Sequence, residues 1–141
     1  MPVVARLAPG CRPRGCRAHG LATVFVVAPS TRDERLKQIT AAGSGFVYAA
    51  SLMGVTGARD SVGTAARDLV RRTRAASDLP VCVGIGVSTP EQAAEIAGFA
   101  DGVIVGSALV EALLEAPDQD AGLAAVRALT AELACGVRGE G

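Results

Sequence analysis

Two short apolar stretches end in glycine just before a helix start, an arrangement that suits the binding of an anion. Residues 81–89 read VCVGIGVST, and residues 102–108 read GVIVGSA. Glycine lets a bound group approach the backbone, while the first turn of a helix offers unpaired N–H groups and the positive end of its dipole. Two such strand ends, about twenty residues apart with a helix between them, fit one phosphate held between neighbouring loops.

Composition and charge limit which classes of protein this sequence can encode. Half of the 141 residues are apolar, 20% are charged and the formal net charge is zero. These values favour one packed domain and indicate neither a nucleic-acid partner nor a membrane partner. No apolar run is long enough for a transmembrane helix. The cysteines form no CxxC pair and His19 has no zinc-ligand spacing, so we expect no metal site, reduced thiols and a cytoplasmic setting.

Three segments can be distinguished along the chain. Residues 1–18 hold four arginines, three prolines and two cysteines without a clear period. We interpret them as foreign to the domain, through a wrong start codon or a frameshift, because a signal-peptide pattern is missing. Residues 19–135 are predicted to form the domain, and residues 136–141 to form a tail.

Within the domain, apolar runs alternate with helical patterns. Strands are expected at residues 23–28, 46–50, 80–85 and 101–105, and helices at 30–42, 64–76, 88–98, 107–115 and 121–134. Ser30 is the expected cap of the first helix. At the third helix, Ser88 and Glu91 have capping-box spacing, while Thr89 and Pro90 have the spacing of an N-cap and first helical residue. A loop is expected at 51–63, and the arginines of helix 64–76 are expected on a solvated face.

This alternation predicts an α/β fold with a parallel sheet and right-handed crossovers. About four strands are too few to close a barrel, which needs eight. A partial barrel and an open doubly wound sheet both remain compatible with the pattern. In either case the site is expected beyond the carboxyl ends of the strands.

A resemblance to the tryptophan synthase α subunit family favours the partial barrel over the doubly wound sheet. Residues 48–59 (YAASLMGVTGAR) resemble the family's mobile sixth loop, with GVTG at 54–57 as the most specific part. Residues 24–29 (VFVVAP), 84–88 (GIGVS) and 105–108 (VGSA) resemble its fifth, seventh and eighth strands. The resemblance runs from about Arg17 to Ala134. It implies the C-terminal half of a (β/α)₈ TIM barrel, from about strand 5 onward.

The resemblance also implies a function and a set of site residues. The family is a lyase of tryptophan biosynthesis that cleaves indole-3-glycerol phosphate into indole and glyceraldehyde 3-phosphate. A β subunit that carries pyridoxal phosphate uses the indole, so this chain itself is expected to need no cofactor. By position, the phosphate ligands are Gly57, Gly86, Gly106 and Ser107, with Gly84 lining the pocket. Thr56 would close over the substrate and help to position a catalytic aspartate, and Tyr48 would line the site.

The acid–base groups of the family are missing from these 141 residues. In the family, a glutamate and an aspartate from the first half of the barrel transfer the protons. The carboxylates of this chain fall mostly on helices or their caps, and Asp60 has no evident partner. We therefore expect a catalytically incomplete chain. The open strand edges of a half-barrel further predict either poor folding alone or a homodimer through those edges.

Two other functions stay open. One is a non-catalytic phosphate-binding or regulatory half-barrel, which the missing carboxylates favour. The other is a different phosphate-binding barrel, such as a phosphoribosyl isomerase or thiamine phosphate synthase, which the GVTG sequence at 54–57 disfavours.

Overall fold

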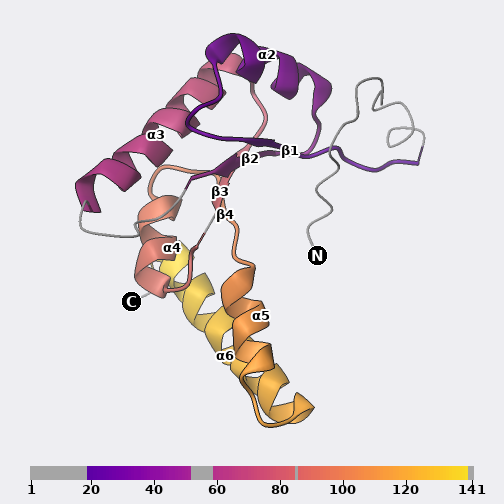
Figure 1. Cartoon of the computed structure of the whole chain (residues 1–141), viewed down its shortest axis with the longest axis vertical. Coiled ribbons are helices and arrows are strands. Elements are labelled where there is room, and N and C mark those ends of the chain that lie inside the picture. Colours follow the sequence, from indigo (N-terminus) through magenta and orange to yellow (C-terminus); the bar gives the residue numbers. More distant parts are fainter. Residues whose placement is uncertain (1–18, 52–58, 85, 140–141) are drawn as a thin grey trace.

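The computed structural model describes residues 19–51, 59–84 and 86–139, except for the side chains of residues 59–62. Within these residues the strands are β1 (Phe25–Val27), β2 (Val47–Ala50), β3 (Val81–Gly84) and β4 (Gly102–Val103). The helices are α2 (Asp33–Ala42), α3 (Arg59–Ala76), α4 (Pro90–Ala97), α5 (Ser107–Leu114) and α6 (Gln119–Arg138), arranged as in Figure 1. The predicted alternation is confirmed, while the segment 1–18 lies outside the described residues.

The order of the strands decides between the two predicted folds. The four strands pair in parallel in the order β1-β2-β3-β4, so each strand lies beside the next one in the chain. Right-handed crossovers that always step in the same direction place their helices on one face of the sheet. A doubly wound sheet instead reverses its strand order and carries helices on both faces. The described sheet is therefore part of a barrel.

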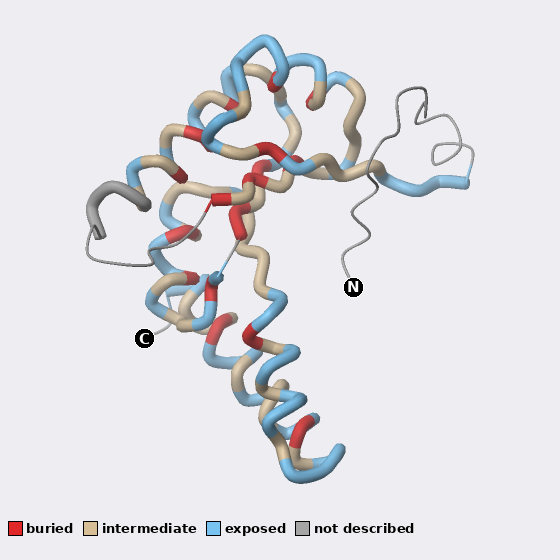
Figure 2. The backbone as a smooth tube through the Cα atoms, in the orientation of Figure 1, coloured by how far each residue is buried: buried red, intermediate tan, exposed pale blue. Residues whose placement is uncertain are grey.

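The core lies between the sheet and the helices that cover it (Figure 2). Alternate strand residues face the helices, and Val27, Val47, Ala49, Val81 and Val83 are fully buried there. The helices contribute buried residues at helical spacing, which are Leu36, Leu69, Val70, Ala93 and Ile96. This one-sided core fixes the position of each strand end and of the loops that follow.

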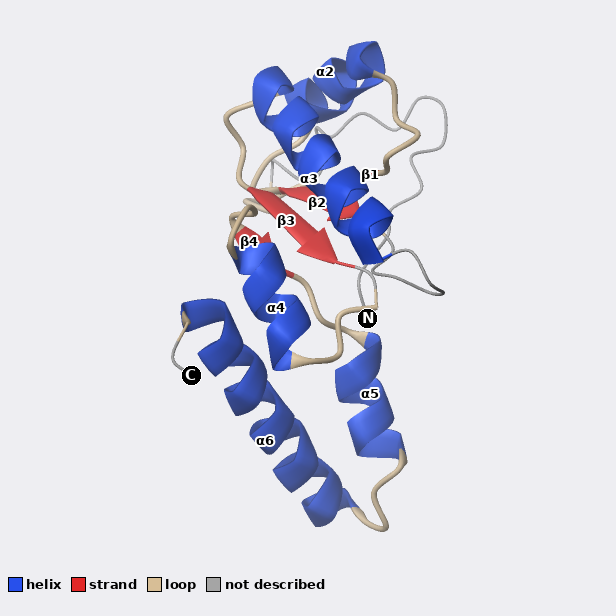
Figure 3. Ribbon diagram, turned by 90° about the vertical axis from the view of Figure 1, so that its left-hand side faces the viewer, coloured by secondary structure: helices blue, strands red, loops and turns tan. Residues whose placement is uncertain are grey.

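Helices α5 and α6 form a hairpin that extends away from the sheet (Figures 1 and 3). The two helices pack on each other, and α6 also packs against α4. Much of the hairpin surface is exposed, including the apolar side chains of Val110, Leu113, Leu114 and Leu123. Helix α6 continues to Arg138, so it passes both the predicted helix end at residue 134 and the start of the predicted tail. Gly139 ends it in the left-handed conformation, with φ of 68°.

The sequence offered two possible caps for α4, and the one at Thr89 is confirmed. Thr89 is the N-cap, with extended φ of −123°, and Pro90 is the first helical residue. The Thr89 side chain accepts a hydrogen bond from Gln92 N at 3.3 Å, and Gln92 Oε1 accepts one from Thr89 N at the same distance. The capping box therefore pairs Thr89 with Gln92, and the alternative pairing of Ser88 with Glu91 is wrong.

The start of α2 differs from the prediction. Arg32 is the N-cap and makes no side-chain capping bond. Ser30 lies in the preceding turn, which is closed when Ala28 N donates to Thr31 Oγ1 at 3.0 Å and Thr31 N donates to the Ala28 carbonyl at 2.8 Å. This turn delays the helix, so the predicted Ser30 cap is wrong.

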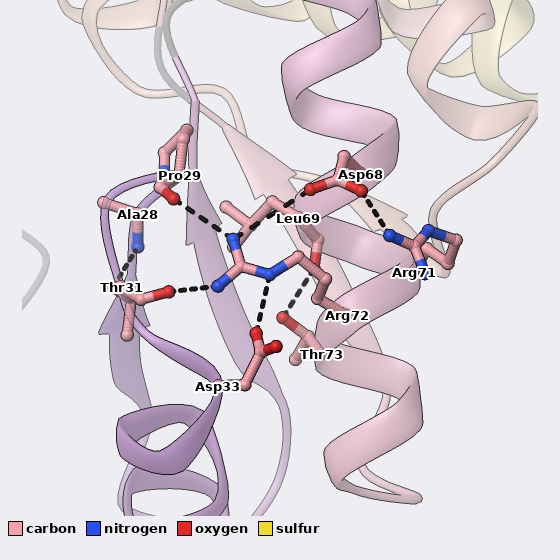
Figure 4. Close-up of polar contacts among 9 residues, drawn as sticks. All are labelled: Ala28, Pro29, Thr31, Asp33, Asp68, Leu69, Arg71, Arg72 and Thr73. Carbon is pink, nitrogen blue, oxygen red and sulfur yellow. Dashed lines mark hydrogen bonds and ion pairs between the residues drawn. The ribbon is translucent and has the colours of Figure 1, made fainter.

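Arg72 of α3 forms hydrogen bonds with the turn that precedes α2 (Figure 4). Its Nε donates to Asp33 Oδ1 at 2.7 Å. Its two terminal nitrogens donate to the carbonyl groups of Pro29, at 3.1 Å, and Thr31. Because only 20% of this side chain is exposed, the predicted solvated face is wrong for Arg72. It holds for Arg71, which is 74% exposed and pairs only with Asp68.

Arg74 and Asp101 join α3 to the amino ends of β3 and β4. Arg74 donates to the Phe99 carbonyl at 2.9 Å and to Asp101 Oδ1 at 2.8 Å. Asp101 Oδ2 in turn accepts from Val81 N at 2.8 Å. The guanidinium of Arg67 lies 4.5 Å from the centre of the Phe99 ring, which adds a cation–π contact. This cluster lies at the edge of the sheet opposite to the predicted phosphate site.

The remaining corrections concern element ends. Helix α3 begins at Arg59, although a loop was expected up to residue 63. Each strand is shorter than predicted, and β4 has only two residues, because apolar character continues past the last ladder pair. The position of every predicted element is nevertheless confirmed.

Candidate functional site

Tyr48 and Gly84 meet at the carboxyl half of the sheet. A Cβ at Gly84 would lie 3.2 Å from Tyr48 Cε2, and only 2.7 Å from both the Cβ and the carbonyl oxygen of Ile104. Glycine is therefore required here by close packing between three neighbouring strand ends. The structure brings these two predicted residues together and adds Ile104, which sequence reasoning missed. Its place in the apolar stretch 102–108 was the available signal, but the strand register was needed to use it.

Gly86 follows β3 in a conformation that favours glycine. Its φ is 71°, and a Cβ built on it would meet no atom within 4 Å. The residue is exposed. The backbone at this position thus turns sharply beside open space, as an approaching ligand group requires.

Gly106 and Ser107 form the corresponding feature after β4. Gly106 is the N-cap of α5, and its carbonyl accepts hydrogen bonds from the N–H groups of Leu109 and Val110 at 3.1 and 3.2 Å. Among the described residues, no acceptor is found for the N–H groups of Ser107 and Ala108. A Cβ on Gly106 would also point into open space. The start of α5 therefore presents unpaired donors and the positive end of a helix dipole.

These two features share one edge of the sheet. Because β3 and β4 pair in parallel, the loops that follow them leave the sheet in the same direction. Gly86, Gly106 and Ser107 are consequently gathered at the carboxyl ends of neighbouring strands, beside Gly84. Backbone N–H groups and open glycine positions in this arrangement can hold an anion such as a phosphate. Thr56 and Gly57 lie outside the described residues.

Two hollows of the described surface lie away from these glycines. One of about 400 Å³ lies beside β4 and is lined by apolar residues that include Val103, Val105 and Leu109. Another, of about 600 Å³, runs between α4 and α6 and includes Pro90 and Cys135. Neither includes the glycines after β3 and β4.

Three titratable groups near the strands have pKa values shifted from their ordinary ones. The pKa of Glu91 is lowered by a hydrogen bond with its own backbone N–H and by one with the Thr89 side chain. The Val81 N–H, followed by Arg74, lowers the pKa of Asp101. Burial, with a smaller effect of Asp101, raises the pKa of the Cys82 thiol. At neutral pH these shifts keep the two carboxylates ionised and the thiol protonated.

The described part of the chain contains neither a cluster of metal-ligating side chains nor a helix that could cross a membrane. No group of three or more histidine, cysteine or carboxylate side chains is placed to hold a metal ion there. None of its helices is both long and apolar enough to cross a membrane.

Comparison with known proteins gives a consistent result. The family model for the tryptophan synthase alpha chain matches residues 11–137. The alpha chain of Streptomyces avermitilis is 76% identical over 121 residues, which cover 86% of this chain and 44% of the relative. The alpha chain of Streptomyces coelicolor is 75% identical over 122 residues, with coverage of 86% and 45%.

Solved structures agree with this match. A tryptophan synthase from Mycobacterium tuberculosis superposes with a TM-score of 0.77 at 53% identity, over 94% of this chain and 49% of that chain. The alpha subunit from Legionella pneumophila superposes with a TM-score of 0.75 at 33% identity, over 89% and 46%. The chain thus spans less than half the length of these relatives. With a matching family model, two close relatives and a shared partial barrel, the chain belongs to the tryptophan synthase alpha chain family.

Proposed function

We propose that this chain supplies the phosphate-binding part of a tryptophan synthase alpha-type site. The observation that carries the proposal is the pair of open backbone positions at Gly86 and Gly106, the second of which caps α5. Unpaired N–H groups at a helix start bind phosphate oxygens without any charged side chain. Ser107 adds a donor at the same helix start, and Gly84 keeps the adjoining strand ends closely packed. The family resemblance assigns Gly57 to the same set.

The proposed substrate is indole-3-glycerol phosphate. Its cleavage breaks the bond between C3 of the indole ring and the glycerol carbon, so C3 must gain a proton and the glycerol hydroxyl must lose one. In the family these transfers belong to a glutamate and an aspartate of the first half of the barrel. Thr56 and Tyr48 have supporting roles in the proposal. We therefore expect these 141 residues by themselves to bind the substrate phosphate and to release no indole.

A second candidate is a phosphate-binding half-barrel with a regulatory and not a catalytic role. The open backbone at Gly86 and Gly106 is compatible with it, because such backbone can hold a phosphate without any acid–base side chain. The two candidates differ in one respect. Only the alpha-type site gains activity when the missing acid–base carboxylates are supplied.

The proposed protein partner is a tryptophan synthase β subunit. Several of the similar structures are of tryptophan synthase from Mycobacterium tuberculosis, and two of them are aminoacrylate-bound forms. The proposal assigns no cofactor to this chain, because pyridoxal phosphate belongs to the β subunit of the family. The free thiols of Cys82 and Cys135 agree with the cytoplasmic setting that forms part of the proposal.

Calorimetry combined with an indole assay tests this function. The purified chain is titrated with indole-3-glycerol phosphate, and indole is measured with and without an added β subunit. We expect saturable binding and no indole above a Thr56→Ala control. Addition of the N-terminal half of the Streptomyces coelicolor alpha chain should then produce indole. Absence of binding would contradict the proposal, and binding without complementation would favour the regulatory candidate.

A further inference from the structure

The turn of residues 86–89, which joins β3 to α4, is fixed on both sides of the open Gly86 position. On the strand side, Gly84 is packed closely, since a Cβ there would lie 2.7 Å from the Cβ of Ile104. On the helix side, the Val87 side chain is only 2% exposed and belongs to the hydrophobic core. Gly86 itself is exposed and has φ of 71°. The chain therefore presents one exposed backbone position between two buried ones.

The side chain of Gln92, in the first turn of α4, holds the end of this turn. Its Oε1 accepts hydrogen bonds from Ser88 N at 2.9 Å and from Thr89 N at 3.3 Å. The Ser88 hydroxyl also donates to it, at 3.4 Å. The Gln92 side chain is part of a half-buried residue, so it is not free to turn into the solvent. One carboxamide oxygen thus fixes two consecutive peptide groups that follow directly on the open glycine.

The helix starts that follow β3 and β4 consequently differ in which donors are free. At α4, the N–H groups of Ser88, Thr89 and Gln92 all have side-chain acceptors. At α5, by contrast, the N-cap makes no side-chain hydrogen bond. Among the residues that the structure describes, no acceptor is found for the N–H group of Gly86. Gln92 and Thr89 therefore satisfy the donors of the α4 start and leave the Gly86 N–H available to an anion.

We propose that Gln92 is a positioning residue for the phosphate site, because its bonds to Ser88 and Thr89 hold Gly86 in the conformation that leaves its backbone open. This inference rests on the proposed function, since it needs a phosphate beside Gly86. Gln92 itself does not touch the phosphate. Glycine adopts many backbone conformations, so the one at Gly86 must be fixed by its neighbours. A backbone that is fixed before the ligand arrives loses less entropy on binding.

Three variants test the proposal by titration calorimetry and by NMR of the ligand-free chain. Gln92→Ala removes the acceptor, so affinity for glycerol 3-phosphate should fall about tenfold and the Gly86 amide resonance should shift. Gln92→Glu keeps an acceptor oxygen, as in an ordinary capping box, and should return that resonance to its position in the unchanged chain. The matched control is Thr89→Ala, which removes only the acceptor for Gln92 N. It should lower the melting temperature without loss of affinity.

Circular dichroism establishes that each variant is folded, and Gln92→Leu replaces Gln92→Ala if the latter does not fold. Unchanged or tighter binding in Gln92→Ala would overturn the proposal. So would an equal loss of affinity in Thr89→Ala, since the loss would then come from a weaker α4, or a Gly86 resonance that Gln92→Glu does not restore. If the unchanged chain binds no glycerol 3-phosphate, the proposed function is refuted, and the ligand-free resonances still confirm or refute the hold of Gln92 on Gly86.

Discussion

Gly106 and Gly84 lie in different physical surroundings. Its φ of −135° does not need glycine, and a Cβ there would meet no protein atom within 4 Å. Gly84 is the opposite case, because a Cβ would lie 2.7 Å from Ile104. The two positions thus differ physically, because Gly106 faces open space whereas Gly84 is required by the close packing of strands.

Substitution of Gly106 tests the role of that open space. Gly106→Ala fills part of the space expected for the phosphate, so affinity for glycerol 3-phosphate should fall at least about tenfold, which is about 1.4 kcal/mol. The melting temperature should stay close to that of the unchanged chain. Titration calorimetry and thermal melting measure the two effects.

Gly84→Ala is the matched control, and it should lower the free energy of unfolding by about 1–3 kcal/mol through overpacking. If Gly106→Ala binds glycerol 3-phosphate as tightly as the unchanged chain, Gly106 does not face the ligand.

Among the helices, α3 is fixed to the turn before α2 by Arg72, which the sequence pattern placed on a solvated face. Arg72 donates to two loop carbonyls and to Asp33, whereas Arg71 makes one exposed ion pair. Arg72→Ala should therefore lower the free energy of unfolding by about 1–3 kcal/mol, because it leaves carbonyl groups without donors. Arg71→Ala should change it by less than about 0.5 kcal/mol. Urea denaturation of both variants checks this, and equal effects would refute the role given to Arg72.

Asp101 gives the contact between α3, β3 and β4 a pH dependence. The Val81 N–H and Arg74 lower its pKa below the ordinary 3.8, so the folded state favours the ionised form. This stabilisation is complete above pH 3.8 and is lost as the pH falls through the lower pKa of the folded state. Since the side chain is 40% exposed, the effect should be on the order of 1 kcal/mol or less.

Asp101→Asn removes that titration. Urea midpoints measured from neutral to acid pH should show the unchanged chain losing its advantage over the variant below pH 3.8. A constant difference between the two proteins across this range would show that the Asp101 carboxylate does not couple to folding.

Element positions were predictable because apolar runs are bounded by glycine, proline and polar residues along this chain. The ends of the elements were less predictable, because they depend on which of several possible partners forms a local hydrogen bond. Gln92 competes successfully with Glu91 for the cap of α4, and the turn closed by Thr31 displaces the cap expected at Ser30. The early start of α3 at Arg59 was hidden by the small and glycine residues of its first turns.

For the whole molecule, alternation of strands and helices could not distinguish a partial barrel from a doubly wound sheet. Strand order decides this, and it depends on pairing between residues that are far apart in the sequence. The glycines of the candidate site were predictable from their types and spacing, whereas the contact of Ile104 with Gly84 required the register. The binding and positioning roles of all the predicted site residues stay predictions, and Thr56 and Gly57 lie outside the described residues.

The most direct test of the phosphate site is an amide-resolved NMR titration of the chain with glycerol 3-phosphate. We predict saturable shifts concentrated at the N–H groups of Gly86, Gly106, Ser107 and Ala108, and their loss in Gly106→Ala. Shifts that do not saturate, or that centre on Cys135 and the hollow between α4 and α6, would contradict a phosphate site at the ends of β3 and β4.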